Sequence, residues 1–208
     1  MPLDSVSDDP WAPTDTQARI GPNSVLQLLK VLEEEGGPRL AAHVLAMGGM
    51  FELPPETGMI DERPVARIHR ALRQDMPDRA PRLAWAAGEA TADYIIANRI
   101  PVPVRWLLRV LPPALSAGVL TRAICKHAWT FAGSGRFLVV SRHPLTFEIV
   151  DNPIVRGETA TCPICFWHTA VFEALFRRLV APDYTAREIR CCACGDAACR
   201  FELTRSGF

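Results

Sequence analysis

Apolar residues recur at helical spacing from residue 21 to residue 132, which predicts a run of helices. The first begins near Asn23, a good N-cap residue type, and continues through VLQLLKVLEEE. The glycine pair 36–37 predicts its end, and Pro38 opens a second helix because proline is tolerated in a first turn. Residues 1–20 lack this period and are rich in Asp, Pro, Ser and Thr, which predicts a mobile tail.

The same pattern predicts three more helices. Residues 61–76 carry apolar side chains on one face, and the alanine-rich residues 82–99 are typical of a long buried helix with close neighbours. A further helix is expected over residues 115–133. Between the last two, residues 101–120 form the most apolar stretch, but two arginines and four prolines make it a poor transmembrane span.

The pattern changes at Gly133, where helical periodicity gives way to β-rich runs. RFLVVSRH and LTFEIVD predict two strands separated by Pro144, and residues 165–180 return to a helix with a broad apolar face. The end of the chain, YTAREIRCCACGDAACRFELTR, predicts two strands joined by a tight turn at Gly195-Asp196. This order predicts one compact α+β domain with an antiparallel sheet packed by helices. Its helical N-terminal half, residues 21–132, is expected to line a ligand pocket, and residues 133–208 form an α+β part that carries the cysteine clusters.

Composition narrows the class of protein. Lysine and arginine balance aspartate and glutamate at 23 residues each, so the chain offers no electrostatic reason to bind nucleic acid. The acidic start, MPLDSVSDDPW, lacks the apolar run of a signal peptide, so we expect a cytoplasmic protein. Thiols stay reduced in that compartment, and seven cysteines therefore indicate metal binding or chemistry before disulfides.

Six of the seven cysteines lie in the last quarter of the chain, in two clusters. The upstream pair has C-x2-C spacing, and the downstream group of four follows Glu188. Zinc is usually held by four ligands from two such short clusters, which makes a zinc site the first interpretation. Two alternatives stay open, small buried core residues and an iron–sulfur cluster on four thiolates. The cysteines are Cys162 and Cys165 upstream, and Cys191, Cys192, Cys194 and Cys199 downstream.

The arrangement C-x-x-C…E-x-x-C-x-x-x-G-x-x-x-C-R-F, after two strands and a helix, resembles the 4-vinyl-reductase domain family over about the last 70 residues. This small-molecule-binding module occurs in bacteriochlorophyll biosynthesis proteins and aromatic-sensing activators, and its fold is related to TRAPP subunits. The resemblance implies a structural zinc on Cys165, Glu188, Cys191 and Cys199. Because Cys162, Cys192 and Cys194 are additional thiols, one metal ligand in each cluster stays unassigned.

The proposed zinc ligands carry a geometric condition. Successive side chains of a regular strand point to opposite faces, so Glu188 and Cys191 would face apart. Both side chains reach one metal only if the strand ends or bulges between them. Four protein ligands would also leave no open position for water or substrate, so the metal is expected to be structural.

The helical first half, without an attached ATPase or DNA-binding domain, is similar to stand-alone family members of bacteriochlorophyll synthesis. The resemblance implies a homodimer that binds or carries a divinyl magnesium-porphyrin or protochlorophyllide-type pigment for other enzymes of that pathway, in the cytoplasm or at the edge of the photosynthetic membrane. The alternative is an enzyme that reduces the pigment's 8-vinyl group. Its electron donor would have to be external, because the sequence shows neither a G-x-G-x-x-G motif after a strand nor a P-loop. A ligand-sensing regulatory module is a third class, disfavoured because no output domain accompanies the chain.

The aromatic and basic residues of the helical half are candidates for a pigment site. Trp106 and Trp129 could line an apolar pocket, and Arg105 with Arg109 could meet carboxylates at its mouth. His127 is the first choice for an axial magnesium ligand, ahead of His43, His69, His143 and His168. The alternatives are that the arginines are simply solvated, that the tryptophans belong to the core, and that the histidines are structural residues held by hydrogen bonds.

Overall fold

The computed structural model describes residues 18–206. Most of the expected N-terminal tail, residues 1–17, lies outside the described residues. The end of that segment is ordered, because β1 (Arg19–Ile20) pairs antiparallel with β2 (Ile60–Asp61) and the Ile20 side chain is fully buried. The prediction of a mobile tail up to residue 20 is therefore wrong at its last two residues.

Local sequence signals account for the first two helices. α1 (Asn23–Met47) is kinked at Gly37, whose φ of 77° and ψ of 177° are not helical, and Pro38 starts the continuation. The two predicted helices thus meet at the predicted junction. α2 (Glu62–Asp75) begins at Asp61, whose carboxylate accepts a hydrogen bond from the Arg63 backbone N–H.

The remaining helices of the first half are α3 (Ala80–Asn98), α4 (Val102–Val110), α5 (Pro113–Lys126) and the short α6 (Trp129–Ala132). Leu111 is extended, with ψ of 150°, because the residue before a proline is disfavoured in the helical region, and this separates α4 from α5. The single helix expected over residues 115–133 is wrong, because the backbone leaves helical geometry at His127.

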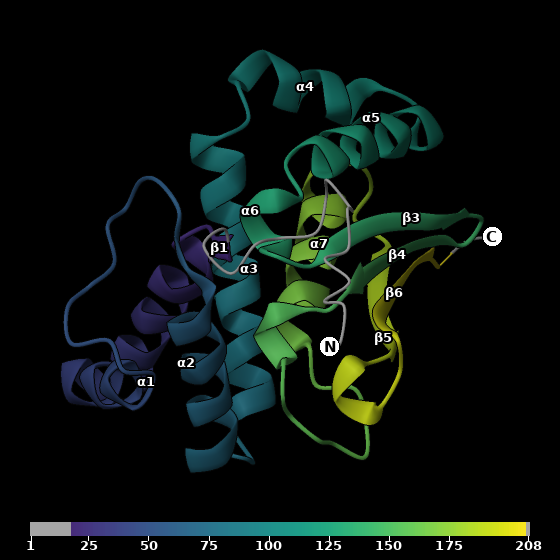
Figure 1. The fold of residues 1–208 in the computed structure, drawn as a ribbon. Coiled ribbons are helices and arrows are strands. Elements are labelled where there is room, and N and C mark those ends of the chain that lie inside the picture. The colour runs from purple at the N-terminus through teal and green to yellow at the C-terminus, as the bar shows by residue number, and fades with distance from the viewer. Residues whose placement is uncertain (1–17, 207–208) are drawn as a thin grey trace, which may run out of the picture.

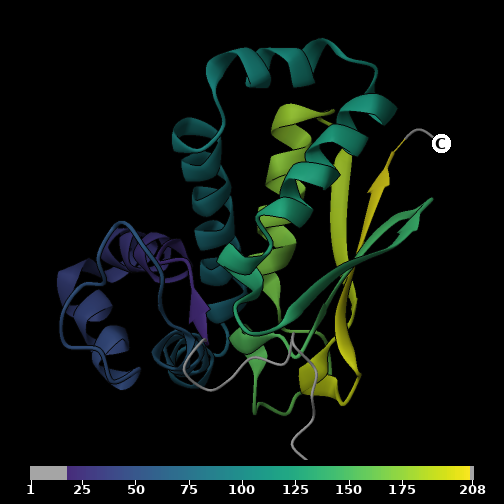
Figure 2. The ribbon, with the colours of Figure 1, turned by 45° about the horizontal axis from the view of Figure 1, so that its top comes forward.

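Four strands form one antiparallel sheet in the order β3-β4-β6-β5. Their bounds are β3 (Arg136–Arg142), β4 (Leu145–Val150), β5 (Tyr184–Arg190) and β6 (Ala198–Arg205). The helix α7 (Phe166–Leu179) packs on one face of this sheet, and Figure 2 shows it between α3 and the strands. Buried phenylalanines fill the space between α7 and the sheet: Phe147, Phe172, Phe176 and Phe201. The predicted α+β fold is confirmed.

α3 and α7 approach closely where Gly88 faces α7. A β-carbon at Gly88 would stand 2.4 Å from the Trp167 carbonyl oxygen and 2.6 Å from the Ala170 β-carbon. The Trp167 indole N–H also donates to the Thr91 hydroxyl over 3.2 Å. The alanine-rich helix thus has the close neighbour that its composition predicted.

Two short 3-10 turns complete the trace of residues 18–206. One, η2 (Pro153–Val155), follows β4, and the other, η3 (Cys192–Cys194), lies between β5 and β6. Gly195 follows η3 with a left-handed φ of 88°. The predicted two-residue turn at Gly195-Asp196 is therefore the end of a longer connection that begins at Cys191. Figure 1 shows this connection at the opposite end of the molecule from α4 and α5.

Candidate metal centre and ligand pocket

The fold brings the two thiol clusters together at one end of the sheet. Cys165 is the residue before the first turn of α7, Glu188 lies on β5, and Cys199 lies on β6. The pairing of β5 with β6 shifts register between Glu188 and Arg190, and β5 ends at Arg190. The strand therefore both bulges and ends, which meets the condition for Glu188 and Cys191 to face one site.

Three buried ligand atoms define this site. The Sγ atoms of Cys165 and Cys199 and a carboxylate oxygen of Glu188 all lie within 4.8 Å of one another. The Sγ atom of Cys191 lies 3.8 Å from that of Cys199. One Glu188 oxygen accepts the Cys165 backbone N–H over 2.7 Å, while its Oε1 is buried without a hydrogen-bond partner. The four residues that the resemblance implied thus converge.

Two further side chains contact Cys165, and sequence reasoning did not assign them to the site. The Asn152 amide donates to the Cys165 sulfur over 3.2 Å, and the His168 Nδ1 atom lies 3.0 Å from it. The other ring nitrogen of His168 donates to the Phe131 carbonyl oxygen over 3.1 Å. His168 follows Cys165 at i+3, a helical neighbour spacing that could have indicated this contact. No comparable spacing in the sequence indicates that Asn152 contacts Cys165.

Burial and mutual repulsion shape the acidity of these groups. Burial, together with the neighbouring thiols of Cys165 and Cys191, raises the pKa of Glu188 to about 10. The hydrogen bond from Cys199 lowers the pKa of Cys191 to about 6. Burial acts to raise the pKa of Cys165, but the hydrogen bond from Cys199 and the nearby His168 hold it well below its usual value. Four acidic groups crowded in one buried place are suited to hold a cation.

The remaining thiols are placed differently. Cys192 is half-buried, and a hydrogen bond from the Cys199 thiol lowers the pKa of its own thiol to about 7, so it stays an alternative to Cys191. Cys162 and Cys194 are exposed, as is Cys125 on α5. Cys162 and Cys194 are therefore not small core residues, which was one interpretation of the clustered cysteines.

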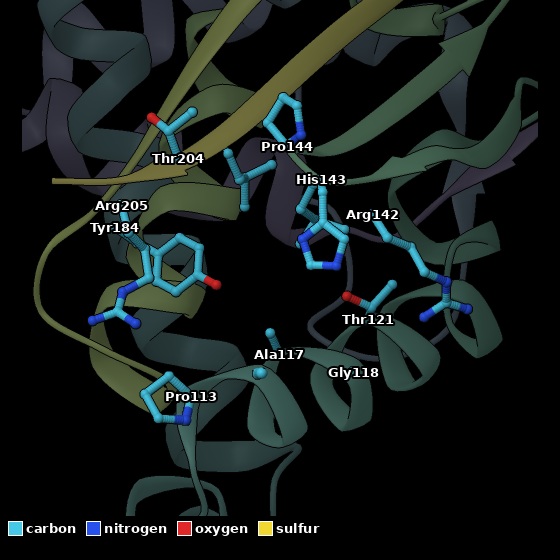
Figure 3. A pocket seen from close by; sticks show the side chains of 13 residues that line it. Pro113, Ala117, Gly118, Thr121, Arg142, His143, Pro144, Tyr184, Thr204 and Arg205 are labelled. Carbon is cyan, nitrogen blue, oxygen red and sulfur yellow. The ribbon is translucent and has the colours of Figure 1, made fainter. Parts of the chain in front are cut away.

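A pocket of about 610 Å³ lies between α5 and the sheet, at the tip of the β3–β4 hairpin. Apolar groups form most of its wall: Pro113, Ala114, Ala117, Pro144, Leu145 and Leu203. Figure 3 shows α5 on one side of this space, with the hairpin and the β5–β6 strands on the other.

Polar groups project into the same pocket. The Thr121 hydroxyl of α5 is buried without a hydrogen-bond partner, and the Tyr184 hydroxyl points into the pocket from β5 (Figure 3). His143 enters from the hairpin and Arg142 lies beside Thr121, both exposed at the rim. Arg205 pairs with Asp183 over 2.9 Å at the far edge.

The five residues predicted to bind the pigment do not line this pocket. Trp106 on α4 and Trp129 on α6 are 65% and 55% exposed, and His127 is exposed after the end of α5. Arg109 is exposed and donates to the Arg178 carbonyl oxygen, and Arg105 is half-buried. On α4 the buried side is taken by Leu108, which leaves Trp106 on the exposed side.

The other histidines also separate by position. His43 is exposed and pairs with Asp75 over 2.8 Å, and His69 is fully buried with its Nε2 atom donating to the Ser24 carbonyl oxygen. His168 contacts Cys165 in the candidate metal centre. His143 is the one of the five that lines the pocket.

Comparisons with known proteins agree with this architecture. The family model of the 4-vinyl-reductase domain matches residues 145–205, which include β4, α7, β5, β6 and all four candidate ligands. Solved H-NOX structures share the fold. One, described as the Fe(II) unliganded H-NOX protein from K. algicida, is 10% identical with a TM-score of 0.58, covering 91% of this chain and 98% of that one. Another, from a study of heme distortion in the H-NOX family, is 11% identical with a TM-score of 0.57 over 90% of this chain and 96% of that one.

Two curated relatives are much closer in sequence. The bacteriochlorophyll synthase 23 kDa chain of Cereibacter sphaeroides is 55% identical over 91% of this chain and 92% of the relative. The protein of the same description from Rhodobacter capsulatus is 47% identical over 94% of this chain and 92% of the relative. The predicted resemblance to the 4-vinyl-reductase domain is confirmed, and the chain belongs to the family of the bacteriochlorophyll synthase 23 kDa chains.

Proposed function

We propose that this protein acts in bacteriochlorophyll synthesis by binding a magnesium tetrapyrrole and carrying it to other enzymes of the pathway. The description of its relatives supports the pathway. The observation that carries the pigment-binding proposal is the pocket between α5 and the sheet, which combines apolar walls with a few convergent polar groups. Its volume of about 610 Å³ falls within the range of about 300–1,000 Å³ common for small-molecule sites.

The polar groups of the pocket match the chemistry of such a pigment. The flat ring is apolar and would pack between α5 and the hairpin, while its carboxylates would reach the rim. Arg142 is placed there, and a guanidinium binds a carboxylate through two parallel hydrogen bonds. The imidazole of His143 would offer a ring nitrogen to the magnesium, and the Thr121 hydroxyl, buried without a partner, would offer a hydrogen bond to a polar ring substituent.

Pigment binding is tested by mixing the purified protein with a divinyl magnesium-porphyrin, with and without NADPH. Absorption follows binding, and chromatography of the extracted pigment reports its vinyl content. We expect a shifted spectrum and unchanged pigment. Recovery of the monovinyl product would instead support the alternative, reduction of the 8-vinyl group with an external donor, and no binding at all would refute the pocket assignment.

A matched pair of histidine variants locates the site. His143→Ala should weaken binding by about tenfold or more and reduce the spectral shift, because it removes one metal bond worth more than about 1.4 kcal/mol. His43→Ala is the control, since His43 is also an exposed histidine but lies on α1 outside the pocket. Equal affinities of the two variants would contradict the assignment of His143.

We further propose that Cys165, Glu188, Cys191 and Cys199 hold one structural zinc ion. Two sulfurs each about 2.3 Å from a tetrahedral zinc lie about 3.8 Å apart, the separation found between the sulfurs of Cys191 and Cys199. The buried Glu188 Oε1, which has no hydrogen-bond partner, is a natural remaining ligand atom. The bound ion would join α7, β5 and β6, and zinc itself has no redox chemistry.

The His168 and Asn152 contacts would orient Cys165 in that site, since groups hydrogen-bonded to a ligand fix its position. Elemental analysis should find about one zinc per chain, and Cys199→Ser should lose it. Cys162→Ser, which alters an exposed thiol, should keep it. Retention of zinc by Cys199→Ser would refute the ligand set. Loss of zinc from Cys192→Ser but not from Cys191→Ser would show that Cys192, and not Cys191, is the ligand.

A further inference from the structure

α4 and α5 turn an apolar surface to the outside of the molecule. We call it the α4–α5 face. Trp106 and Val102 on α4 are each 65% exposed, and Leu115 on α5 is 59% exposed. The face comprises Val102, Trp106, Leu107 and Val110 of α4 with Leu115 and Val119 of α5. Figure 1 shows both helices at the end of the molecule opposite η3.

The exposure follows from the positions of these residues on the two helices. Val102, Trp106 and Val110 stand at i, i+4 and i+8 and form one stripe of α4, while Leu108, 2% exposed, packs inward on the other side. A helix on the surface of a soluble domain normally turns its apolar stripe inward and its polar stripe outward. On α4 the stripe that faces outward is apolar, which is the reverse of this usual arrangement.

Basic residues accompany this apolar surface. Residues 94–147 contain seven lysines and arginines and no acidic residue, although the whole chain has a formal net charge of zero. On α5 the exposed Leu115 and Val119 continue into Arg122 and Lys126 at helical spacing, i+7 and i+11 from Leu115. Within residues 18–206, none of the seven pairs with a carboxylate: Arg99, Arg105, Arg109, Arg122, Lys126, Arg136 and Arg142.

We infer that the α4–α5 face docks on the surface of a bilayer that contains anionic lipids. An apolar face with tryptophan, flanked by lysine and arginine, is the composition that lies in the interface between lipid headgroups and acyl chains. The apolar side chains would enter that boundary while the cations meet lipid phosphates. Across residues 18–206, no helix is both long enough and apolar enough to cross a bilayer, so the contact would be at the surface.

The charge distribution favours a lipid surface over a second copy of the chain. A two-fold symmetric contact places the same patch on both sides of the interface. Here that would bring the arginines and lysine beside one α4–α5 face against those beside the other, with no acidic residue from either α4 or α5 to offset them. An anionic surface is complementary to the face, whereas a copy of itself is not.

Docking would also place the proposed pigment pocket at the membrane. Pro113, Ala117 and Thr121 of α5 line the pocket, while Leu115 and Val119 of the same helix belong to the docking face. One helix thus separates the membrane contact from the pocket. The docking proposal does not depend on pigment binding, because its residues and its test are different.

The test is co-sedimentation of the full chain with vesicles. We expect wild type to bind vesicles of phosphatidylcholine mixed with phosphatidylglycerol and to bind phosphatidylcholine alone much more weakly. Trp106→Ser with Leu107→Ser should lower the partition coefficient at least about tenfold. Phe51→Ser with Leu53→Ser is the matched control, since Phe51 and Leu53 are 85% and 68% exposed but lie outside the face.

Charge variants test the second part of the interaction. Arg122→Glu with Lys126→Glu should also lower partitioning at least about tenfold, since each cation near an anionic surface contributes about fivefold. Lys30→Glu with Arg39→Glu changes the net charge equally on α1 and should have a much smaller effect. Added salt should weaken wild-type binding.

Three results would overturn the inference: no binding of wild type to anionic vesicles, equal binding by the face and control variants, or a wild-type dimer that the face variant abolishes without any vesicle binding. The last result would assign the face to a second copy of the chain. Circular dichroism checks that each variant is folded, and Leu115→Ser with Val119→Ser repeats the test on α5 if the α4 variant does not fold.

Discussion

Gly88 offers a stringent test of how α3 and α7 pack. Replacing it with alanine would place a β-carbon 2.4 Å from the Trp167 carbonyl oxygen, 2.6 Å from the Ala170 β-carbon and 3.2 Å from the Val171 nitrogen. Ordinary contacts of this kind begin at 3.4 Å. Two of the three atoms belong to the α7 backbone, so no flexible side chain can move aside, and the two helices would have to separate.

The magnitude follows from two opposing effects. Alanine in place of a helical glycine is favourable by about 1 kcal/mol. Overpacking a buried contact costs about 1–3 kcal/mol and sometimes more, and here the atoms that would have to give are backbone. Taking the upper end of that cost, about 3 kcal/mol, against the gain of about 1 kcal/mol, we expect Gly88→Ala to lower the free energy of unfolding by about 2 kcal/mol net, out of the roughly 5–15 kcal/mol typical of a domain.

Gly118→Ala is the matched control, because Gly118 is also helical but a β-carbon there meets nothing within 4 Å. It should raise the free energy of unfolding by about 0.5–1 kcal/mol. Urea denaturation followed by circular dichroism measures both variants, with the slope m checked for constancy. Equal stabilities of Gly88→Ala and Gly118→Ala would refute the close crossing of α3 and α7.

Two further predictions concern pH and metal. Burial lowers the pKa of His69 to about 3, so the unfolded chain binds this proton near pH 6.5 while the folded chain does not. Stability should therefore fall as pH drops from 6.5 toward 3, by about 2 kcal/mol between pH 7 and pH 5. His69→Leu should remove that part of the slope in urea titrations, and an unchanged slope would show that His69 is not its source. A chelator should lower the melting temperature of wild type by about 10 °C but leave that of Cys199→Ser unchanged, because metal binding contributes folding free energy; equal shifts would contradict a zinc on Cys199.

Local signals in the sequence predicted most elements. The break at Gly37, the start of α2 at Asp61 and the strands on either side of Pro144 follow from backbone preferences of single residues. The break at His127 was missed because neither glycine nor proline marks it. The two thiol clusters were likewise evident from spacing, since their ligands lie near one another in the chain.

The sequence by itself determined the α+β class, the order of most elements and the two thiol clusters, because periodicity, turn chemistry and cysteine spacing are local properties. Only the tertiary structure decided that Asn152 and His168 contact Cys165, that His143 rather than His127 lines the pocket, and that Trp106 faces outward. A period shows that a helix has an apolar stripe. Which neighbour, if any, covers that stripe depends on packing between segments far apart in the chain.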